Sequence, residues 1–197
     1  MSIRPRPRIR KLARGGFALN LPTDERSLLR ELPRQLVAGL ELLEAGETVS
    51  DGVRRILPTA NPTDPEQESA FVARHRAALL AHHMDALDIV SNTADSSRLN
   101  EVEIDGWLTA ITDLRLALGV MLGVTEEEHR LDPDAPDYAD WVCYHYLSFL
   151  QNEVIEVLSS ELPSPIPGAG DDLPEDPWGE PLGGLRWDGT PLPNQEE

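Results

Sequence analysis

The sequence has few of the residues that stabilise secreted proteins or build membrane spans. It contains one cysteine, Cys143, and one lysine, Lys11, among 197 residues. A single cysteine excludes a disulfide within the chain and is typical of the reducing cytosol. No apolar run reaches the length of a membrane span, and no hydrophobic segment follows the basic start as a signal peptide requires. We therefore expect a soluble cytoplasmic protein without membrane contact.

The patterns of common catalytic and metal sites are also missing. There is no glycine-rich phosphate loop, nucleophile elbow, paired cysteine motif or helical Glu-x-x-His pair. His75 and His82 lie seven positions apart, about 10 Å along a helix axis, which is too far to share one ion easily. The adjacent His82 and His83 point about 100° apart. We therefore predict no catalytic, cofactor-binding or metal-binding residue and no cofactor.

Negative charge dominates the sequence, with a net charge of −18, but it is unevenly distributed. An acidic protein repels phosphate backbones and favours basic partners or solubility. We expect a protein partner and do not expect nucleic acid as the main one, although the basic N-terminal arm over residues 1–14 leaves that alternative open. That arm has six cationic residues and no acid: Arg4, Arg6, Arg8, Arg10, Lys11 and Arg14.

Residues 101–122 predict a central helix. Asn100 and Glu103 form a capping-box pattern at its start, and Gly123 can end it in the left-handed conformation. Apolar residues lie on nearly all faces, so we expect this helix to be buried among the others. The main stripe is Ile104, Trp107, Ile111, Leu114, Leu118 and Met121, and Leu108, Leu116, Val120 and Leu122 lie on the remaining faces.

Two charged residues interrupt the apolar character of that helix. Asp113 and Arg115 are two positions apart, so their side chains point about 200° apart and cannot pair with each other. Each needs its own neighbour or solvent, because a buried charge without a partner is costly. We interpret them as members of structural ion pairs. A catalytic or partner-binding role is the alternative.

The same helix carries a resemblance to a known family. The run from Trp107 to Gly119, followed by Leu122-Gly123, resembles an actinobacterial family of uncharacterised proteins catalogued only as a domain of unknown function. The similarity extends from about Gly15 to Leu158. An Asn commonly precedes the Asp in that family, whereas Thr112 stands there in this chain. Members are often encoded near the substrate adaptor of the Clp protease, so the resemblance implies a link with regulated proteolysis and no activity.

The other elements predict an all-α fold, a four-helix-like bundle around the central helix, with a small N-terminal β-hairpin. Gly15-Gly16 supplies the hairpin turn, and Arg98-Leu99 is a candidate third strand. Thr23 is expected to cap a helix that Pro33 kinks or divides. The apolar stripe of that helix is Leu28, Leu32, Leu36, Leu40 and Leu43. Three further helices are predicted after it: a short one over 50–57, a long one from Asp64 to about Val90, and a last one from about 136 to 161.

The last helix has an unusual outer face. Trp141, Tyr144 and His145 lie opposite its expected core stripe, and such an aromatic face can be a partner or homodimer surface. Cover by the C-terminal tail is the alternative. The expected core stripe is Ala139, Val142, Cys143, Tyr146, Leu147, Leu150, Val154 and Val157.

Beyond the predicted helical domain, 15–161, residues 162–197 form a Pro/Gly-rich acidic tail that we expect to be disordered. The tail contains Trp178 and Trp187, which a purely solubilising segment does not need. We regard them as candidate docking residues for a partner. Packing on the protein's own domain is the alternative.

Three functional classes follow from these patterns. The first is a non-enzymatic interaction or regulatory protein, and the absence of a catalytic constellation favours it. The second is a nucleic-acid-binding regulator that uses the basic arm, although the long helices have no concentrated basic face. The third is an enzyme in which Asp113 and Arg115 converge with acids or histidines from other helices.

Overall fold

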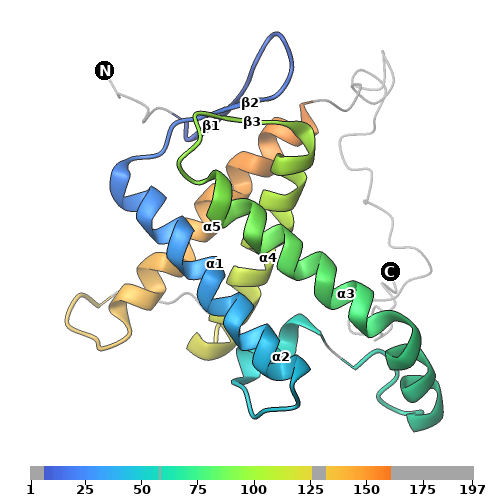
Figure 1. The fold of residues 1–197 in the computed structure, drawn as a ribbon. Coiled ribbons are helices and arrows are strands. Elements are labelled where there is room, and N and C mark those ends of the chain that lie inside the picture. The colour runs from blue at the N-terminus through green and yellow to red at the C-terminus, as the bar shows by residue number, and fades with distance from the viewer. Residues whose placement is uncertain (1–6, 58, 126–131, 161–197) are drawn as a thin grey trace, which may run out of the picture. The chain divides into compact units, whose positions relative to one another are not determined.

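The computed structural model describes residues 7–57, 59–125 and 132–160. The whole predicted tail, with Trp178 and Trp187, and the first six residues of the predicted basic arm lie outside them. Helices dominate, and a small antiparallel sheet is present, so the predicted fold class is confirmed. The elements are β1 (Ile9–Lys11), β2 (Phe17–Leu19), α1 (Thr23–Glu44), α2 (Asp51–Ile56), α3 (Pro65–Thr93), β3 (Arg98–Leu99), α4 (Glu101–Leu122) and α5 (Tyr138–Ser159) (Figure 1).

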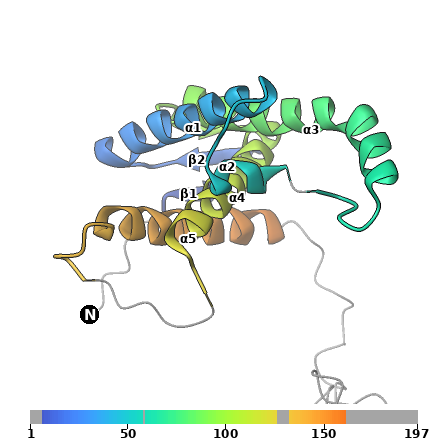
Figure 2. The same cartoon turned by 90° about the horizontal axis from the view of Figure 1, so that it is seen from below.

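Helix α4 lies in the middle of the helical layers. It contacts α3 and α1 on one side, α5 on the other, and the short helix α2 near its C-terminal half (Figure 2). The capping box of Asn100 and Glu103 is present, and Gly123 ends the helix with φ +63°. Trp107 and Ile111 are fully buried, but Met121 is 65% exposed. The prediction that this helix is buried on all sides is therefore wrong for its last two turns, where no described helix covers the outer face.

The sheet covers one end of the core. Its order is β1-β2-β3 with antiparallel pairing, so the candidate third strand is confirmed. Ile9, Phe17 and Leu99 are buried on the same face. The turn between β1 and β2 contains Gly15 and Gly16 with positive φ, as the hairpin pattern predicts.

The predicted basic arm partly belongs to this fold. One carboxylate oxygen of Glu153 on α5 accepts hydrogen bonds from the backbone N–H groups of Arg8, at 2.8 Å, and Ile9, at 3.2 Å. The Arg8 guanidinium pairs with Glu25 at 2.6 Å, and the Tyr146 hydroxyl donates to the same carboxylate at 3.1 Å. Burial raises the pKa of Tyr146 far above its usual value, so the hydroxyl keeps its proton. These contacts cover part of an edge strand and fix the sheet against α1 and α5.

Helix α1 differs from its prediction in three ways. Pro22, and not Thr23, occupies the N-cap position, and no side chain caps the helix. Pro33 does not divide it, because the ring is buried against the core and this packing offsets the missing backbone hydrogen bond. Leu29 is fully buried where Leu28 was expected, whereas Leu36 and Leu40 are buried as predicted, so only the first half of the core stripe differs.

Helices α2 and α3 begin within one residue of their predicted starts. The side chain of Ser50 caps α2 and that of Asp64 caps α3, with Pro65 in the first turn of α3. The side-chain amide of Gln67 donates to the Asp64 carboxylate at 2.9 Å, so the reciprocal bond of a capping box is not formed. A Cβ on Gly52 would lie 2.5 Å from the carbonyl oxygen of Ala117 on α4. Only glycine therefore allows α2 to approach the α4 backbone this closely.

The core stripe of α5 contains Leu147, Leu150 and Val154, which are fully buried. Ala139 and Val142, which were predicted to extend it, are exposed, because only the later turns of α5 pack against the central core. None of the helices in the described parts of the chain has the length and apolar character needed to span a bilayer.

Candidate functional site

Asp113 and Arg115 contact different neighbours. Asp113 is only 4% exposed, and the Nδ1 atom of His83 on α3 lies 2.7 Å from its Oδ2 atom. The hydrogen bond to Asp113 raises the pKa of His83; burial opposes this shift and the charge of Asp113 adds to it. Asp113 therefore belongs to a largely buried His–Asp pair between α3 and α4. Sequence reasoning missed the pair, although Leu80, His83 and Leu87 share one helix face and could have indicated that His83 points inward.

Arg115 has only neutral partners within the described residues. Its Nη1 group donates to the side-chain oxygen of Gln151, and its Nη2 group lies 3.4 Å from the Tyr144 hydroxyl. The guanidinium carbon lies 5.3 Å from the centre of the Tyr144 ring, a cation–π distance. The Nε atom is buried and has no hydrogen-bond partner in the structure. The positive charge of Arg115 is therefore held in place, and no carboxylate of the described residues neutralises it.

Arg115 and Tyr144 line an open groove formed by α2, α4 and α5, which we call the arginine groove. Arg55 supplies a second cation, and no ion pair of Arg55 is found in the described part of the chain. Leu116 and Val120, at 38% and 37% exposure, contribute apolar surface. The groove thus combines two cations with apolar walls. Its lining residues are Arg55, Thr112, Arg115, Leu116, Gly119, Val120, Gly123, Val124 and Tyr144.

The predicted aromatic face of α5 is only partly exposed. Trp141 lies on the side away from the core residues of α5 and is only 6% exposed, so its ring is not an open surface for a partner in this structure. Its indole N–H donates to Asp137 at 3.1 Å, and the Tyr144 and His145 rings lie about 6.0 Å away. Tyr144 belongs to the arginine groove, and His145 is exposed beside it.

Cys143 lies on the inner side of α5 and packs against the core. Burial raises the pKa of its thiol to about 11, and the nearby Asp140 adds to the shift. Because the thiolate is the reactive form, this cysteine has the properties of a small apolar residue and not of a nucleophile.

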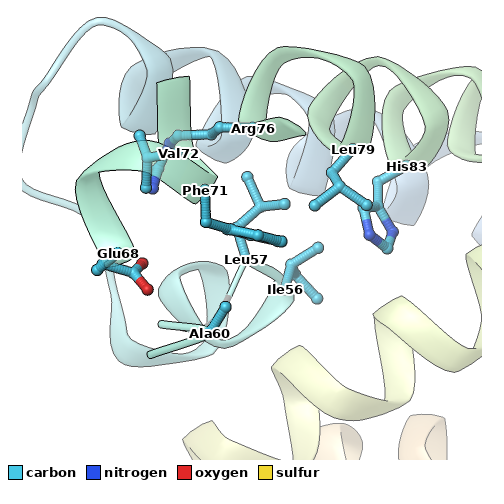
Figure 3. Close-up of a pocket in the computed structure, with 9 residues that line it drawn as sticks. All are labelled: Ile56, Leu57, Ala60, Glu68, Phe71, Val72, Arg76, Leu79 and His83. Atoms are coloured by element: carbon cyan, nitrogen blue, oxygen red, sulfur yellow. The ribbon is translucent and has the colours of Figure 1, made fainter. Parts of the chain in front are cut away.

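A second hollow lies between α2 and α3, and we call it the α2–α3 pocket. It has a volume of about 230 Å³. Phe71, Leu79 and His83 of α3 point toward Ile56 and Leu57 across it (Figure 3). Across the described ranges, no group of three or more His, Cys, Asp or Glu side chains is arranged to hold a metal ion.

Comparison with known proteins establishes the family. The family model described as "Domain of unknown function (DUF2017)" matches residues 7–158. The chain belongs to this family. The match covers every helix and strand described above except the last residue of α5. No solved structure matches the chain.

Curated relatives carry a more informative name. Proteins named "Oxidative stress regulator AosR" from Mycobacterium bovis and Mycobacterium tuberculosis are 29% identical to this chain over 140 residues. The aligned region covers 62% of this chain and 64% of each relative. The chain therefore spans less than two thirds of the length of the relatives it matches.

Proposed function

We propose that this protein is a non-enzymatic regulatory protein that binds a partner protein through the arginine groove. The observation that supports this most directly is Arg115, whose guanidinium is fixed by Tyr144 and Gln151 and has no carboxylate partner in the described residues. A positioned cation of this kind can form charge-assisted hydrogen bonds with an incoming carboxylate. Its desolvation is already partly complete, because the side chain is half-buried.

The chemistry of the groove indicates an acidic partner segment with an apolar side chain. Arg55 and Arg115 attract carboxylates, and Leu116 and Val120 provide a surface for an apolar anchor. Arginine and aromatic residues in partly desolvated positions are common hot spots of protein interfaces. The net charge of −18 repels an acidic partner elsewhere on the protein. The local positive charge of the arginine groove would therefore attract an acidic segment of the partner and orient it on the protein surface.

The biological setting is part of the proposal. The regulatory role is consistent with the name of the mycobacterial relatives. The family resemblance to proteins encoded near the Clp adaptor makes components of regulated proteolysis the first partners to test. We place the protein in the cytoplasm. The proposal includes no oxidant-sensing thiol, because the one cysteine of this chain is largely buried and its thiol has a raised pKa.

The test compares two matched substitutions on α4. Val120→Glu places a carboxylate in the arginine groove, and Val102→Glu places one at a 72% exposed site outside it. Purified full-length variants are used to capture candidate partners, and binding of each purified partner is then measured at several salt concentrations. We expect Val120→Glu and Arg115→Gln to lose at least tenfold in affinity and Val102→Glu to bind normally. Equal binding by all variants would reject the groove as the interface.

The predicted tail residues require a separate test. Trp178→Ala and Trp187→Ala in the full chain should weaken partner binding if the tail also docks, and they should leave it unchanged if the groove acts alone. A self-association assay by sedimentation distinguishes a homodimer from a different partner.

The nucleic-acid alternative is tested on the same protein. Arg8 is already paired with Glu25, which leaves Arg10 and Arg14 as exposed arginines of the described N-terminal stretch. DNA retention that falls steeply with salt would favour this alternative. No retention at low salt would reject it.

A further inference from the structure

The α2–α3 pocket has the features of a small-molecule site. Six apolar residues provide most of its wall, and three polar residues, Glu68, Arg76 and His83, lie around it. Its volume of about 230 Å³ is below the common range for drug-sized ligands, so the pocket suits a smaller molecule. The apolar residues are Ile56, Leu57, Ala60, Phe71, Val72 and Leu79.

His83 gives the pocket a directed polar group. Its Nδ1 atom is occupied by Asp113 at 2.7 Å, which fixes the ring orientation. The other ring nitrogen, Nε2, has no hydrogen-bond partner among the described residues, and the His83 side chain is 19% exposed. A histidine whose Nδ1–H is donated to a carboxylate carries a proton on Nε2 when it is charged. When His83 is protonated, the pocket therefore meets an N–H donor at Nε2 whose orientation is fixed by Asp113.

The charges around the pocket favour an anionic acceptor. Asp113 balances the charge of His83, so additional positive potential comes from Arg76, which has no ion pair within the described parts of the chain. Glu68 lies at the other end of the pocket from His83, with one carboxylate oxygen 2.7 Å from the backbone nitrogen of Asn61 (Figure 3). A second anionic group on the ligand would be repelled there.

We propose that the α2–α3 pocket binds a small apolar monocarboxylic acid. The carboxylate accepts a hydrogen bond from Nε2 of His83, and the hydrocarbon or aromatic part packs against Phe71, Leu79 and Ile56. This site is separate from the arginine groove, and its occupancy does not depend on the proposed partner.

The experiment titrates the full-length protein with phenylacetate and with its neutral analogue phenylacetamide. Binding is followed by calorimetry and by the NMR signals of the histidine rings. We expect phenylacetate to bind with a dissociation constant of about 1 mM or tighter, typical of a weak small-ligand site. It should shift the His83 ring signal and leave that of the exposed His145 on α5 unchanged, and phenylacetamide should bind at least tenfold more weakly.

Two variants locate the site. Leu79→Trp fills the pocket from a residue that is 38% exposed and outside the central core, so we expect a folded protein that loses phenylacetate binding. His82→Gln is the matched control and should bind like the wild type. No phenylacetate binding to the wild type, no shift at His83, or undiminished binding to Leu79→Trp would each overturn the proposal.

Discussion

The Nδ1 atom of His83 lies 2.7 Å from Oδ2 of Asp113, which connects α3 to α4 across thirty positions in the sequence. The raised pKa of His83 gives this contact a defined pH dependence. A base whose pKa is higher in the folded state stabilises the fold fully below its unfolded pKa of about 6.5, and this contribution is lost as the pH rises through the folded value.

His83→Gln should therefore be most destabilising at low pH. We expect a loss of about 1.5–3 kcal/mol in the free energy of unfolding at pH 6, the range for a hydrogen bond between charged groups. The difference from the wild type should shrink above neutral pH. Urea unfolding at pH 6 and pH 8 measures it, with His82→Gln as the control. An effect that is equal at both pH values would contradict the charged pair.

Gly52→Ala should be strongly destabilising. The added Cβ would lie 2.5 Å from the backbone carbonyl oxygen of Ala117, and a backbone atom cannot move without shifting α2 from α4. We expect a loss of about 1–3 kcal/mol or more, which exceeds the helix-propensity gain of about 1 kcal/mol.

Gly39→Ala is the matched comparison for that substitution. Its Cβ would lie 2.8 Å from a methyl group of the half-buried Val53, and a side chain can rotate away. Thermal unfolding of both variants should show a clearly smaller decrease in melting temperature for Gly39→Ala. A decrease of the same size for both would show that the backbone contact of Gly52 is not the limiting one.

Thr93→Val should remove the polar partner of the most buried aromatic residue. The Trp107 indole N–H donates to the Thr93 hydroxyl at 2.8 Å, and that hydroxyl donates to the carbonyl of Ile89 at 2.6 Å. We expect a loss of about 1–3 kcal/mol, because a buried donor is left unsatisfied. A double-mutant cycle with Trp107→Phe, measured by urea unfolding, should show coupling; additive effects would mean that the hydrogen bond contributes little.

Cys143 should react slowly in the native protein. Burial raises its thiol pKa to about 11, so only a small fraction is thiolate at pH 8. Alkylation by iodoacetamide, followed by mass spectrometry, should be at least tenfold slower in the native protein than in urea. Equal rates would indicate an accessible thiol and would return oxidation to consideration as a regulatory input.

Much of the fold could be predicted because its signals are local. Three of these signals each depend on a few adjacent residues, and the structure has the predicted local geometry at each. They are the capping box of Asn100 and Glu103, the helix start at Asp64-Pro65 and the turn at Gly15-Gly16. Burial was less predictable where it depends on distant neighbours. Trp141 is buried although it lies opposite the core stripe, and Met121 is exposed although it continues one.

The candidate site could also be predicted only in part, because its contacts join residues that are far apart in the sequence. Helix geometry establishes that Asp113 and Arg115 cannot pair with each other, and the structure gives each a different neighbour. Which neighbours they have could not be derived, because His83 and Tyr144 come from helices whose rotation depends on side-chain packing. The sequence suggested Tyr144 as a partner-binding residue. Its contact with Arg115 could be seen only in the structure, because it depends on how α4 and α5 pack against each other.

The sequence by itself determined the capped start and the glycine end of α4, the hairpin turn and the acidic character of the protein, since these follow from residue type and short spacing. Only the tertiary structure decided that Arg55 and Arg115 share a groove and that His83 faces both Asp113 and a pocket. The physical reason is that backbone hydrogen bonds and caps act within a few residues. The position of a charge relative to apolar surface depends instead on how whole helices pack.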